Sequence, residues 1–280
     1  MKRYWKPVVT GIGVAALMVL VMLKLTMNFQ VLLFLGTALF FAAGLLNAGK
    51  GTHYLVTALA VSGFFLAVFI GIVLEQLPQL WYFVPVYLAG ALLGVLFKKH
   101  KIRAGVAAAA LTAGMLFAAI EMIPGDLEDM LAKERDDALP EFTIRHMNGE
   151  TTESGSLAGK VVVLDFFGTW CKPCILELKE LAKVQAAFDE NEVVFFVINA
   201  DQGRDTPEKF EAFIDKNDYT FHYAYDHGSE IFKKLKMDHL GLPTLLVVDK
   251  DQRIRFQHVG YNPAETHFVE RLTETINGLK

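Results

Sequence analysis

The chain has 280 residues, of which 53% are hydrophobic and 21% charged, and its mean hydropathy is +0.33. It is too apolar for an ordinary soluble protein and too charged for a bundle made only of membrane helices. Residues 1–123 carry nine Lys and Arg against two Asp and Glu, whereas residues 124–280 carry eighteen against twenty-nine. This pattern excludes a disordered chain, a single soluble domain and a basic nucleic-acid-binding protein, and it predicts a membrane part followed by an acidic soluble part.

Five apolar blocks in the first part are each about as long as the ~20 residues that cross a bilayer as a helix. We predict transmembrane helices over residues 8–23, 29–46, 54–74, 80–97 and 104–123. The first block resembles a signal peptide, but no small-residue cleavage motif follows Leu23, so an uncleaved helix is expected. The fifth block is rich in Ala and has Glu121 near its end, and the compartment of the second part depends on it.

Basic residues predict the orientation of this bundle, because Lys and Arg concentrate on the cytoplasmic side. With the N-terminus inside, eight of the nine basic residues face the cytoplasm: Lys2, Arg3, Lys6, Lys50, Lys98, Lys99, Lys101 and Arg103. Lys24 is the exception, and Glu75 and the acidic run 126–129 fall outside. Five helices in a bacterial inner membrane then place the second part outside the cytoplasm, whereas four would leave it inside.

The predicted membrane bundle has almost no ionisable residues within its helices. Gly90 and Gly94 have the small-x-x-x-small spacing typical of closely packed helices, and Trp81, Tyr82 and Phe83 are expected to form an interfacial aromatic belt. We interpret the bundle as a lipid-embedded anchor and docking surface. A quinone or partner site within it is the alternative, and the sequence does not locate one.

The second part begins with residues 124–140, predicted to be a charged linker in the form of a short helix or a tether. The pattern changes from residue 141 onward. We predict a hairpin over 141–145 and 151–153, strands over 161–167, 193–200, 244–249 and 253–259, helices over 172–189, 206–217 and 265–279, and an extended edge segment over 219–225. This order predicts a mixed sheet with helices on its faces.

The chain has two cysteines, Cys171 and Cys174, which stand in a Cys-x-x-Cys pair where a buried strand gives way to a helix. A zinc site would need four ligands, and the eight histidines show no ligand spacing. A structural disulfide across so short a loop would stabilise little. A redox dithiol is favoured, because a helix N-terminus stabilises a thiolate. We expect Cys171 to be the nucleophile and Cys174 to resolve the mixed disulfide.

The segment from Val163 to Cys174, followed by Glu177 and by Gly241-Leu-Pro-Thr244, resembles the thioredoxin superfamily. Its phrase Gly-Thr-Trp-Cys-Lys-Pro-Cys resembles the membrane-anchored TlpA/ResA-like thiol-disulfide oxidoreductases. The resemblance covers about residues 138–280. It implies that residues 141–280 form an α/β thioredoxin-like domain after a multi-pass α-helical membrane domain over residues 1–123.

The resemblance also implies roles for the residues around the cysteines. Trp170 would shape the docking surface. Pro243 would follow a cis peptide bond, which places the Leu242 backbone opposite Cys171 to pair with a substrate strand. A cis bond before proline is a minority state in general.

Two acids complete the implied catalytic set. Asp165 matches the buried acid of thioredoxin that helps Cys174 lose its proton, whereas the ResA-like branch more often has a neutral residue there. Burying a carboxyl in so apolar a strand is costly, which favours a functional role for Asp165. Glu177 matches the acid that the branch carries one turn after the cysteine pair, and a solvated helix face is the alternative.

Together these features predict a membrane-tethered enzyme that reduces disulfides of extracytoplasmic proteins, with apocytochrome c thiols among the candidate substrates. A non-catalytic redox-sensing or docking module on a membrane anchor is the alternative. A thiol peroxidase is disfavoured, because Gly168 stands three residues before Cys171, where that chemistry needs Thr. Since no cysteine precedes Cys171, we expect a separate membrane electron donor of the CcdA or DsbD kind. No metal, other cofactor or nucleic acid is expected.

Overall fold

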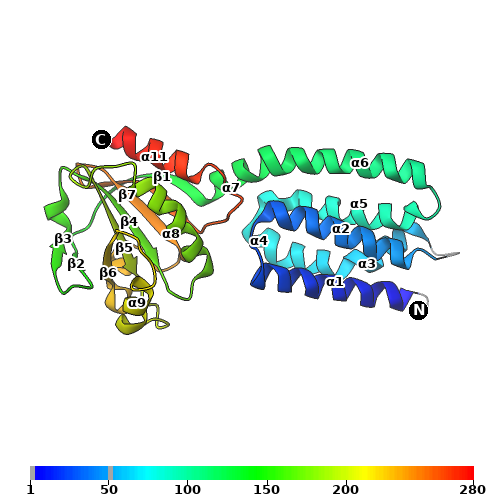
Figure 1. Cartoon of the computed structure of the whole chain (residues 1–280), viewed down its shortest axis with the longest axis horizontal. Helices are drawn as coiled ribbons and strands as arrows, with labels where there is room; N and C mark the ends of the chain where they lie inside the picture. Colours follow the sequence, from blue (N-terminus) through cyan, green and yellow to red (C-terminus); the bar gives the residue numbers. More distant parts are fainter. Residues whose placement is uncertain (1–3, 50–52) are drawn as a thin grey trace. The chain divides into compact units, whose positions relative to one another are not determined.

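The computed structural model of the chain describes residues 4–49 and 53–280, which divide into two compact units, Met1–Leu127 and Glu128–Lys280. The first unit is helical, and the second combines a sheet with helices (Figure 1).

Apolar helices make up the first unit. Its helices are α1 (Trp5–Lys24), α2 (Phe29–Asn47), α3 (Tyr54–Val68), α4 (Leu74–Gln76), α5 (Phe83–Phe97) and α6 (Lys101–Phe117), and α7 (Ile123–Leu131) begins in this unit and ends in the second. A π-helical turn extends α3 through residues 69–73, and another joins α6 to α7 through residues 118–122. Five stretches are long and apolar enough to cross a membrane: Trp5–Lys24, Phe29–Asn47, Tyr54–Val73, Pro78–Phe97 and Lys101–Leu131. All five predicted apolar helices are therefore present.

Helices α2 and α5 approach each other closely, as the glycine spacing predicts. A Cβ atom at Gly94 would lie 2.0 Å from the Phe41 carbonyl oxygen, and one at Gly90 would lie 3.0 Å from atoms of Thr37. The Tyr87 hydroxyl adds a hydrogen bond to the Leu32 carbonyl at 2.8 Å. Glycine is needed here because a side chain would force the two backbones apart.

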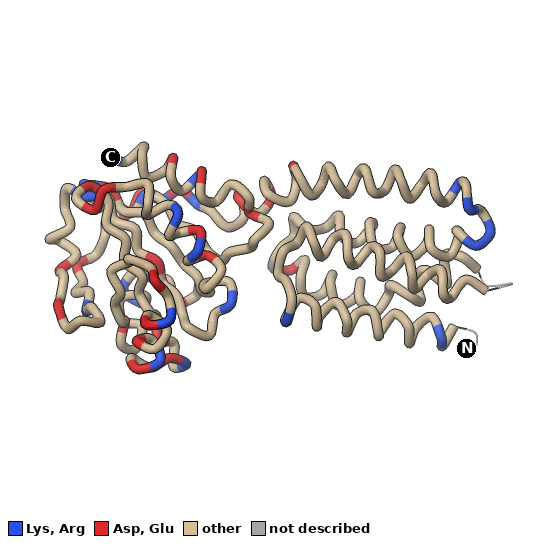
Figure 2. Tube along the Cα trace, viewed as in Figure 1, with Lys and Arg blue, Asp and Glu red and all other residues tan. Residues whose placement is uncertain are grey.

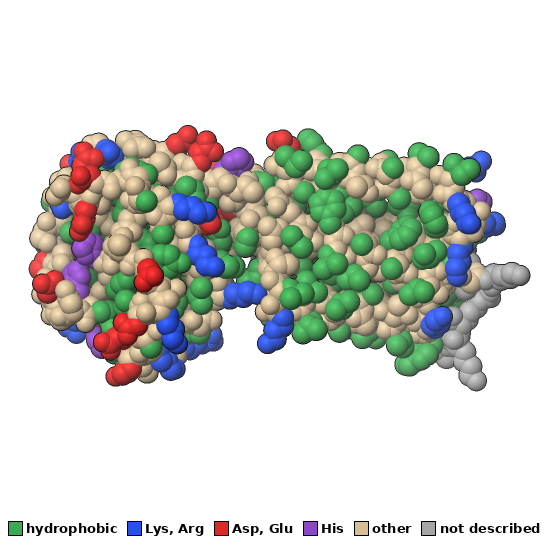
Figure 3. Space-filling model, viewed as in Figure 1, with side chains coloured by type: hydrophobic (Ala, Val, Ile, Leu, Met, Phe, Trp, Pro, Cys, Tyr) green, Lys and Arg blue, Asp and Glu red, His purple; other side chains and the backbone are tan. Residues whose placement is uncertain are grey.

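The outer surface of this unit is apolar, and its charged residues lie at the ends of the helices (Figures 2 and 3). Of the exposed large hydrophobic side chains in the described residues, all but Trp170 belong to this unit. Trp81 is exposed, but Tyr82 and Phe83 are buried against neighbouring rings. The prediction of an interfacial belt was therefore wrong for these two aromatics, which pack inside the bundle.

A six-stranded mixed sheet forms the second unit, in the order β1-β8-β7-β4-β5-β6. The strands are β1 (Ala132–Ala138), β4 (Val161–Phe167), β5 (Val193–Asn199), β6 (His222–Tyr225), β7 (Thr244–Val248) and β8 (Arg253–Val259). Strands β4, β5 and β6 run parallel, and β7, β8 and β1 are added antiparallel. The predicted mixed sheet, and the edge strand within residues 219–225, are confirmed.

Helices and a small hairpin complete this unit. The helices are α8 (Lys172–Gln185), α9 (Pro207–Ile214), α10 (Glu230–Lys234) and α11 (Phe268–Leu279). The predicted hairpin is present as β2 (Thr143–Arg145) paired with β3 (Thr151–Glu153). Because side chains alternate along a strand, Val163 of β4 joins the core formed with α8 and α11, whereas Leu164 joins the core formed with α10.

The predicted linker over residues 124–140 begins with a short helix, as one of the two predicted forms allowed, but its second half is a strand of the sheet and not a tether. Residues 123–131 form α7, and residues 132–138 form β1, which pairs antiparallel with β8. Asp136 of β1 contacts the guanidinium groups of Arg253 and Arg255 at 2.6 and 2.5 Å. A charged strand fits this place because an edge strand can face solvent, and charges on it discourage pairing with other chains.

Candidate active site

The two cysteines lie at the N-terminus of α8, immediately after the turn that follows β4. They form a disulfide with a Cα–Cα distance of 5.3 Å. Cys171 is the N-cap residue of α8 and is 4% exposed, whereas Cys174 is completely buried. The Cys174 backbone N–H points to the Cys171 Sγ at 3.3 Å. In the dithiol form the same N–H and the helix dipole would stabilise a Cys171 thiolate.

The peptide bond between Leu242 and Pro243 is cis, as predicted, and Leu242 packs against the core cluster that contains Cys171 and Cys174. Pro243 precedes β7, whose first residue, Thr244, pairs with Phe166 near the end of β4. The Pro243 carbonyl accepts a hydrogen bond from Gly260 N–H at 2.8 Å. The Leu242 backbone forms no hydrogen bond with the described residues, so its N–H and C=O remain open to an extended peptide.

Trp170 is the one exposed large hydrophobic side chain of the second unit, with 39% of its surface accessible. The Arg204 guanidinium lies over its ring, 4.4 Å from the centroid. A flat apolar ring next to a disulfide is suited to contact with a protein substrate.

Asp205 fixes the turn that carries Trp170, and no motif or spacing in the sequence singles it out. It is buried and accepts hydrogen bonds from the Thr169 backbone N–H and from Asn199 Nδ2, both at 2.8 Å. The Thr169 hydroxyl also donates to it. Asp205 follows β5 and Thr169 follows β4, and because these strands are parallel their C-terminal ends meet at one edge of the sheet.

Asp165 is completely buried within β4, as the sequence predicts. Neither carboxyl oxygen has a hydrogen-bond partner among the described residues. Burial and the nearby Glu177 raise the pKa of Asp165 well above its ordinary value, against the opposing charge of His258. A carboxyl in this environment holds a proton, and it can exchange that proton with a neighbouring group.

Glu177 is also completely buried, so the alternative of a solvated helix face is wrong. It lies one turn after Cys174 on the inner side of α8. Burial raises the pKa of Glu177, and His258 opposes that rise.

His258 and Glu265, which sequence reasoning missed, complete an acid–histidine cluster with Asp165 and Glu177. His258 Nδ1 lies 3.6 Å from Glu177 Oε1, and His258 Nε2 lies 2.7 Å from Glu265 Oε1. Burial disfavours the charged imidazole, but Glu177 and Glu265 outweigh it and raise the pKa of His258 to about 9. The imidazole therefore carries a charge at neutral pH, between two carboxyl groups.

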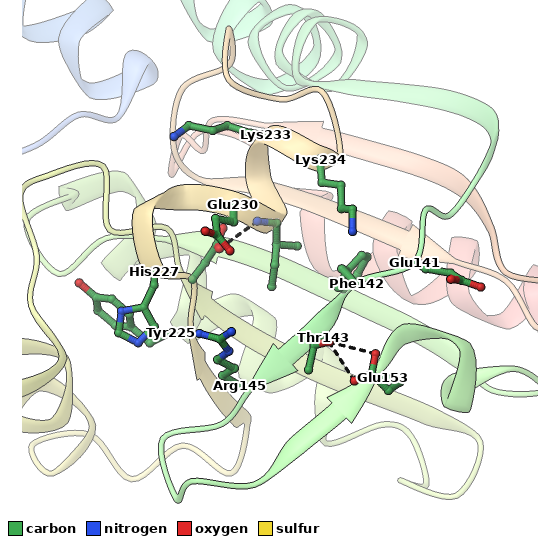
Figure 4. Close-up of a pocket in the computed structure, with 12 residues that line it drawn as sticks. Glu141, Phe142, Thr143, Arg145, Glu153, Tyr225, His227, Glu230, Lys233 and Lys234 are labelled. Carbon is green, nitrogen blue, oxygen red and sulfur yellow. Dashed lines mark hydrogen bonds between the residues drawn. The ribbon is translucent and has the colours of Figure 1, made fainter.

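A cavity of about 730 Å³ lies apart from this site, between the β2–β3 hairpin and α10. Figure 4 shows Arg145 on the hairpin side and Lys233 and Lys234 on the α10 side. Its lining includes neither cysteine and none of the acid–histidine cluster. The thiol chemistry therefore does not use this cavity.

Known proteins resemble this chain in the region of the site. The AhpC/TSA family matches residues 136–257. Thiol-disulfide oxidoreductase ResA of Bacillus cereus (strain ZK / E33L) is 30% identical over 126 residues, which cover 45% of this chain and 70% of the relative. ResA of Bacillus thuringiensis subsp. konkukian is 32% identical over 115 residues, which cover 41% and 64%. The chain thus spans 64% of the length of this second relative.

Among solved structures, a Chlorobium tepidum protein assigned as thiol:disulfide interchange protein DsbE is 24% identical. The match covers 52% of this chain and 97% of that one, with a TM-score of 0.46. The mixed sheet and the Cys-x-x-Cys disulfide at the start of α8 define a thioredoxin-superfamily domain. Within that superfamily, the chain belongs to the ResA-like thiol-disulfide oxidoreductase family.

Proposed function

We propose that the protein is a membrane-tethered thiol-disulfide oxidoreductase that reduces disulfides of extracytoplasmic proteins. The observation that carries the proposal is the Cys171–Cys174 disulfide at the N-terminus of α8, with one completely buried acid on the preceding strand and another on α8 itself. The kinship with proteins named thiol-disulfide oxidoreductase ResA supports the same chemistry.

The reaction is a pair of thiol–disulfide exchanges. The Cys171 thiolate attacks one sulfur of the substrate disulfide, forms a mixed disulfide and releases the first substrate thiolate. Cys174 passes its proton to a buried carboxylate and attacks the Cys171 sulfur, which releases the second substrate thiolate. The substrate gains two electrons and two protons, one proton from Cys174 and one from solvent, and the enzyme ends as the Cys171–Cys174 disulfide.

Glu177 is the acceptor of the Cys174 proton in this proposal, whereas Asp165 already holds a proton that it can exchange with a neighbouring group. Both lie on the side of the sheet that α8 covers, where solvent cannot take the proton directly. A substrate peptide would lie across Trp170 and pair with the open Leu242 backbone next to Pro243.

The membrane assignment rests on the five long apolar helices and on the charges at their ends. The Lys and Arg cluster that spans the α5–α6 turn lies at the same end of the bundle as the start of α1 (Figure 2). By the positive-inside rule this end is cytoplasmic, and the thioredoxin-like domain is then extracytoplasmic at a bacterial inner membrane. Lys2, Arg3 and Lys50, which enter the same prediction, lie outside the described residues.

The oxidised enzyme must be reduced again by another dithiol. Since both cysteines lie in the thioredoxin-like domain, the electrons must reach it from a separate membrane dithiol protein of the CcdA or DsbD kind. In this proposal the residues up to about 127 are the anchor and docking surface for that donor, and residues 128–280 do the chemistry. Apocytochrome c disulfides are candidate substrates.

Turnover with a renewable reductant tests the enzyme against the non-catalytic alternative. The full chain in detergent micelles is given insulin and dithiothreitol, and insulin reduction is compared for the wild type, C171S and C174S. We expect many turnovers for the wild type, background rates for C171S, and a strongly reduced rate for C174S, because only dithiothreitol can then resolve the mixed disulfide on Cys171. A wild-type dithiol that oxidises once and does not turn over would favour the sensing or docking module.

A reporter fused after Lys280 tests the compartment independently. Alkaline phosphatase activity there, together with a dark green-fluorescent-protein fusion, is the expected result. A fluorescent fusion without phosphatase activity would place the domain in the cytoplasm and contradict the five-helix orientation.

A further inference from the structure

The acid–histidine cluster takes its side chains from two strands, one helix and the segment before α11, on a single face of the sheet. Asp165 of β4 pairs with Leu245 of β7, and Leu245 pairs with His258 of β8. Directly opposed residues on neighbouring strands point to the same face, so Asp165 and His258 both point toward α8. Glu177 reaches this row from α8, and Glu265 closes it from the segment before α11.

Each side chain of this cluster is at most 4% exposed. Isolated buried charges are costly and occur in proteins mainly when they are paired. His258 is aligned by a 2.7 Å contact to Glu265 on one nitrogen and faces Glu177 at 3.6 Å with the other. The ring is also held by Phe268 of α11, 5.1 Å between centroids.

We propose that His258, oriented by Glu265, is a positioning residue that holds the Glu177 carboxylate in place and in its charged form to receive the Cys174 proton. This inference rests on the proposed function and extends it to a pair of residues outside the Cys-x-x-Cys helix. It also explains how Glu177 can accept a proton in a buried position. The imidazolium of His258 stabilises the negative charge of the carboxylate, as water does for a carboxylate at the surface.

None of the other ionisable groups that the structure describes around the cluster can take the place of His258 as the cation next to Glu177. Asp165 faces Glu177 and His258 from β4 as an acid, and Tyr261 faces Glu177 and Glu265 from the segment after β8. Arg271 of α11 is a nearby cation, but its guanidinium lies over the Phe256 ring and contacts Glu128 at 2.9 Å. His258 is thus the cation that contacts Glu177 among the described residues.

The proposed step moves one proton and forms one bond. In the mixed-disulfide intermediate the Cys174 thiol gives its proton to Glu177. The Cys174 thiolate forms a bond to the Cys171 sulfur, and the bond between that sulfur and the substrate breaks with departure of a thiolate. Glu177 then returns the proton to solvent or to the departing thiolate when the site opens, and a dithiol donor restores the reduced enzyme.

A two-phase thiol assay isolates this step. The reduced full chain in detergent micelles is mixed with the aromatic disulfide dithiobis(nitrobenzoate) in a stopped-flow instrument. Cys171 releases the first coloured thiolate, and Cys174 releases the second when it displaces the group held on Cys171. The two phases therefore report the nucleophile and the resolving cysteine separately.

We expect H258Q to slow the second phase about tenfold or more near neutral pH and to leave the first phase within about twofold, as for loss of one partner of a buried ion pair. The wild-type and H258Q profiles should converge above about pH 9, where wild-type His258 loses its own proton. E265Q should slow the same phase to a lesser degree. In an E177Q background, H258Q should have no further effect, because His258 acts through Glu177.

The chain offers a matched control in His222. This histidine contacts Glu190 on the surface at 2.7 Å, the same distance as between His258 and Glu265. H222Q should leave both phases unchanged. Equal second phases for folded H258Q and wild type across the pH range, or equal additional slowing by H258Q in the E177Q background, would overturn the inference. If H258Q does not fold, E265Q decides by the same criteria. A wild type that releases neither thiolate would instead contradict the proposed function.

Discussion

Replacing Asp165 with Asn should make the thioredoxin-like domain progressively more stable than the wild type as the pH rises. The carboxyl has an ordinary pKa of 3.8, and burial followed by the repulsion of Glu177 raises its pKa well above that value in the folded protein. Between these two values the folded state binds a proton that the unfolded state has lost. The wild type therefore loses stability as the pH increases through this window, whereas the amide of D165N does not titrate.

The size of the effect follows from proton linkage. One bound proton per molecule changes the free energy of unfolding by about 1.4 kcal/mol for each pH unit. Asp165 is completely buried, so solvent does not screen this contribution. The difference in free energy between D165N and the wild type should thus grow by about 1.4 kcal/mol per unit above roughly pH 5, up to the pKa of the folded carboxyl.

The measurement is urea unfolding of the oxidised full chain in micelles, followed by hydrogen exchange of β4 and β5 peptides so that only the sheet is observed. D249N is the control, because Arg255 contacts the Asp249 carboxylate at 2.5 Å and the net effect is a lowered pKa, although burial opposes it. Asp249 is then ionised in both states above about pH 5, so D249N should differ from the wild type by a constant amount. A pH-independent difference for D165N would refute the reasoning.

Three further substitutions test other parts of the structure. G94A should lower the stability of the bundle by about 1–3 kcal/mol through overpacking. G63A, where a Cβ has open space, should leave it unchanged. Equal shifts of the thermal unfolding midpoint of the two variants in micelles would contradict this. D205A should lower domain stability by about 1–3 kcal/mol by leaving buried donors such as Thr169 N–H unpaired, which urea unfolding measures. W170A should raise KM for insulin severalfold while kcat changes less. A fall in kcat with an unchanged KM would contradict a role of Trp170 in substrate binding.

Much of the site was predictable because its signals are local. The cysteine spacing, the proline within the pair and the buried strand before it place Cys171 and Cys174 at a helix start, where the structure has them. The cis bond at Pro243 was predicted from the family resemblance and is confirmed. Hydropathy alone also identified the five long apolar helices, because their length and composition leave few alternatives.

The residues that the sequence did not reveal depend on contacts between distant segments. His258 stands 81 positions from Glu177 in the chain, and only the register of β7 with β8 places it on the same face. Strand β1 has no apolar alternation, and it joins the sheet through backbone pairing and ion pairs with β8, a segment that is distant in the sequence. Tyr82 lies inside the bundle because packing between helices decides which side of an aromatic segment is buried.

Trapping of mixed disulfides in membranes tests the central claim most directly. C174S keeps the nucleophile Cys171 but cannot resolve the intermediate, so in intact cells it should accumulate covalent adducts with extracytoplasmic proteins that a reductant releases. C171S should accumulate none. Adducts of C171S as abundant as those of C174S, or adducts only with cytoplasmic proteins, would contradict the account.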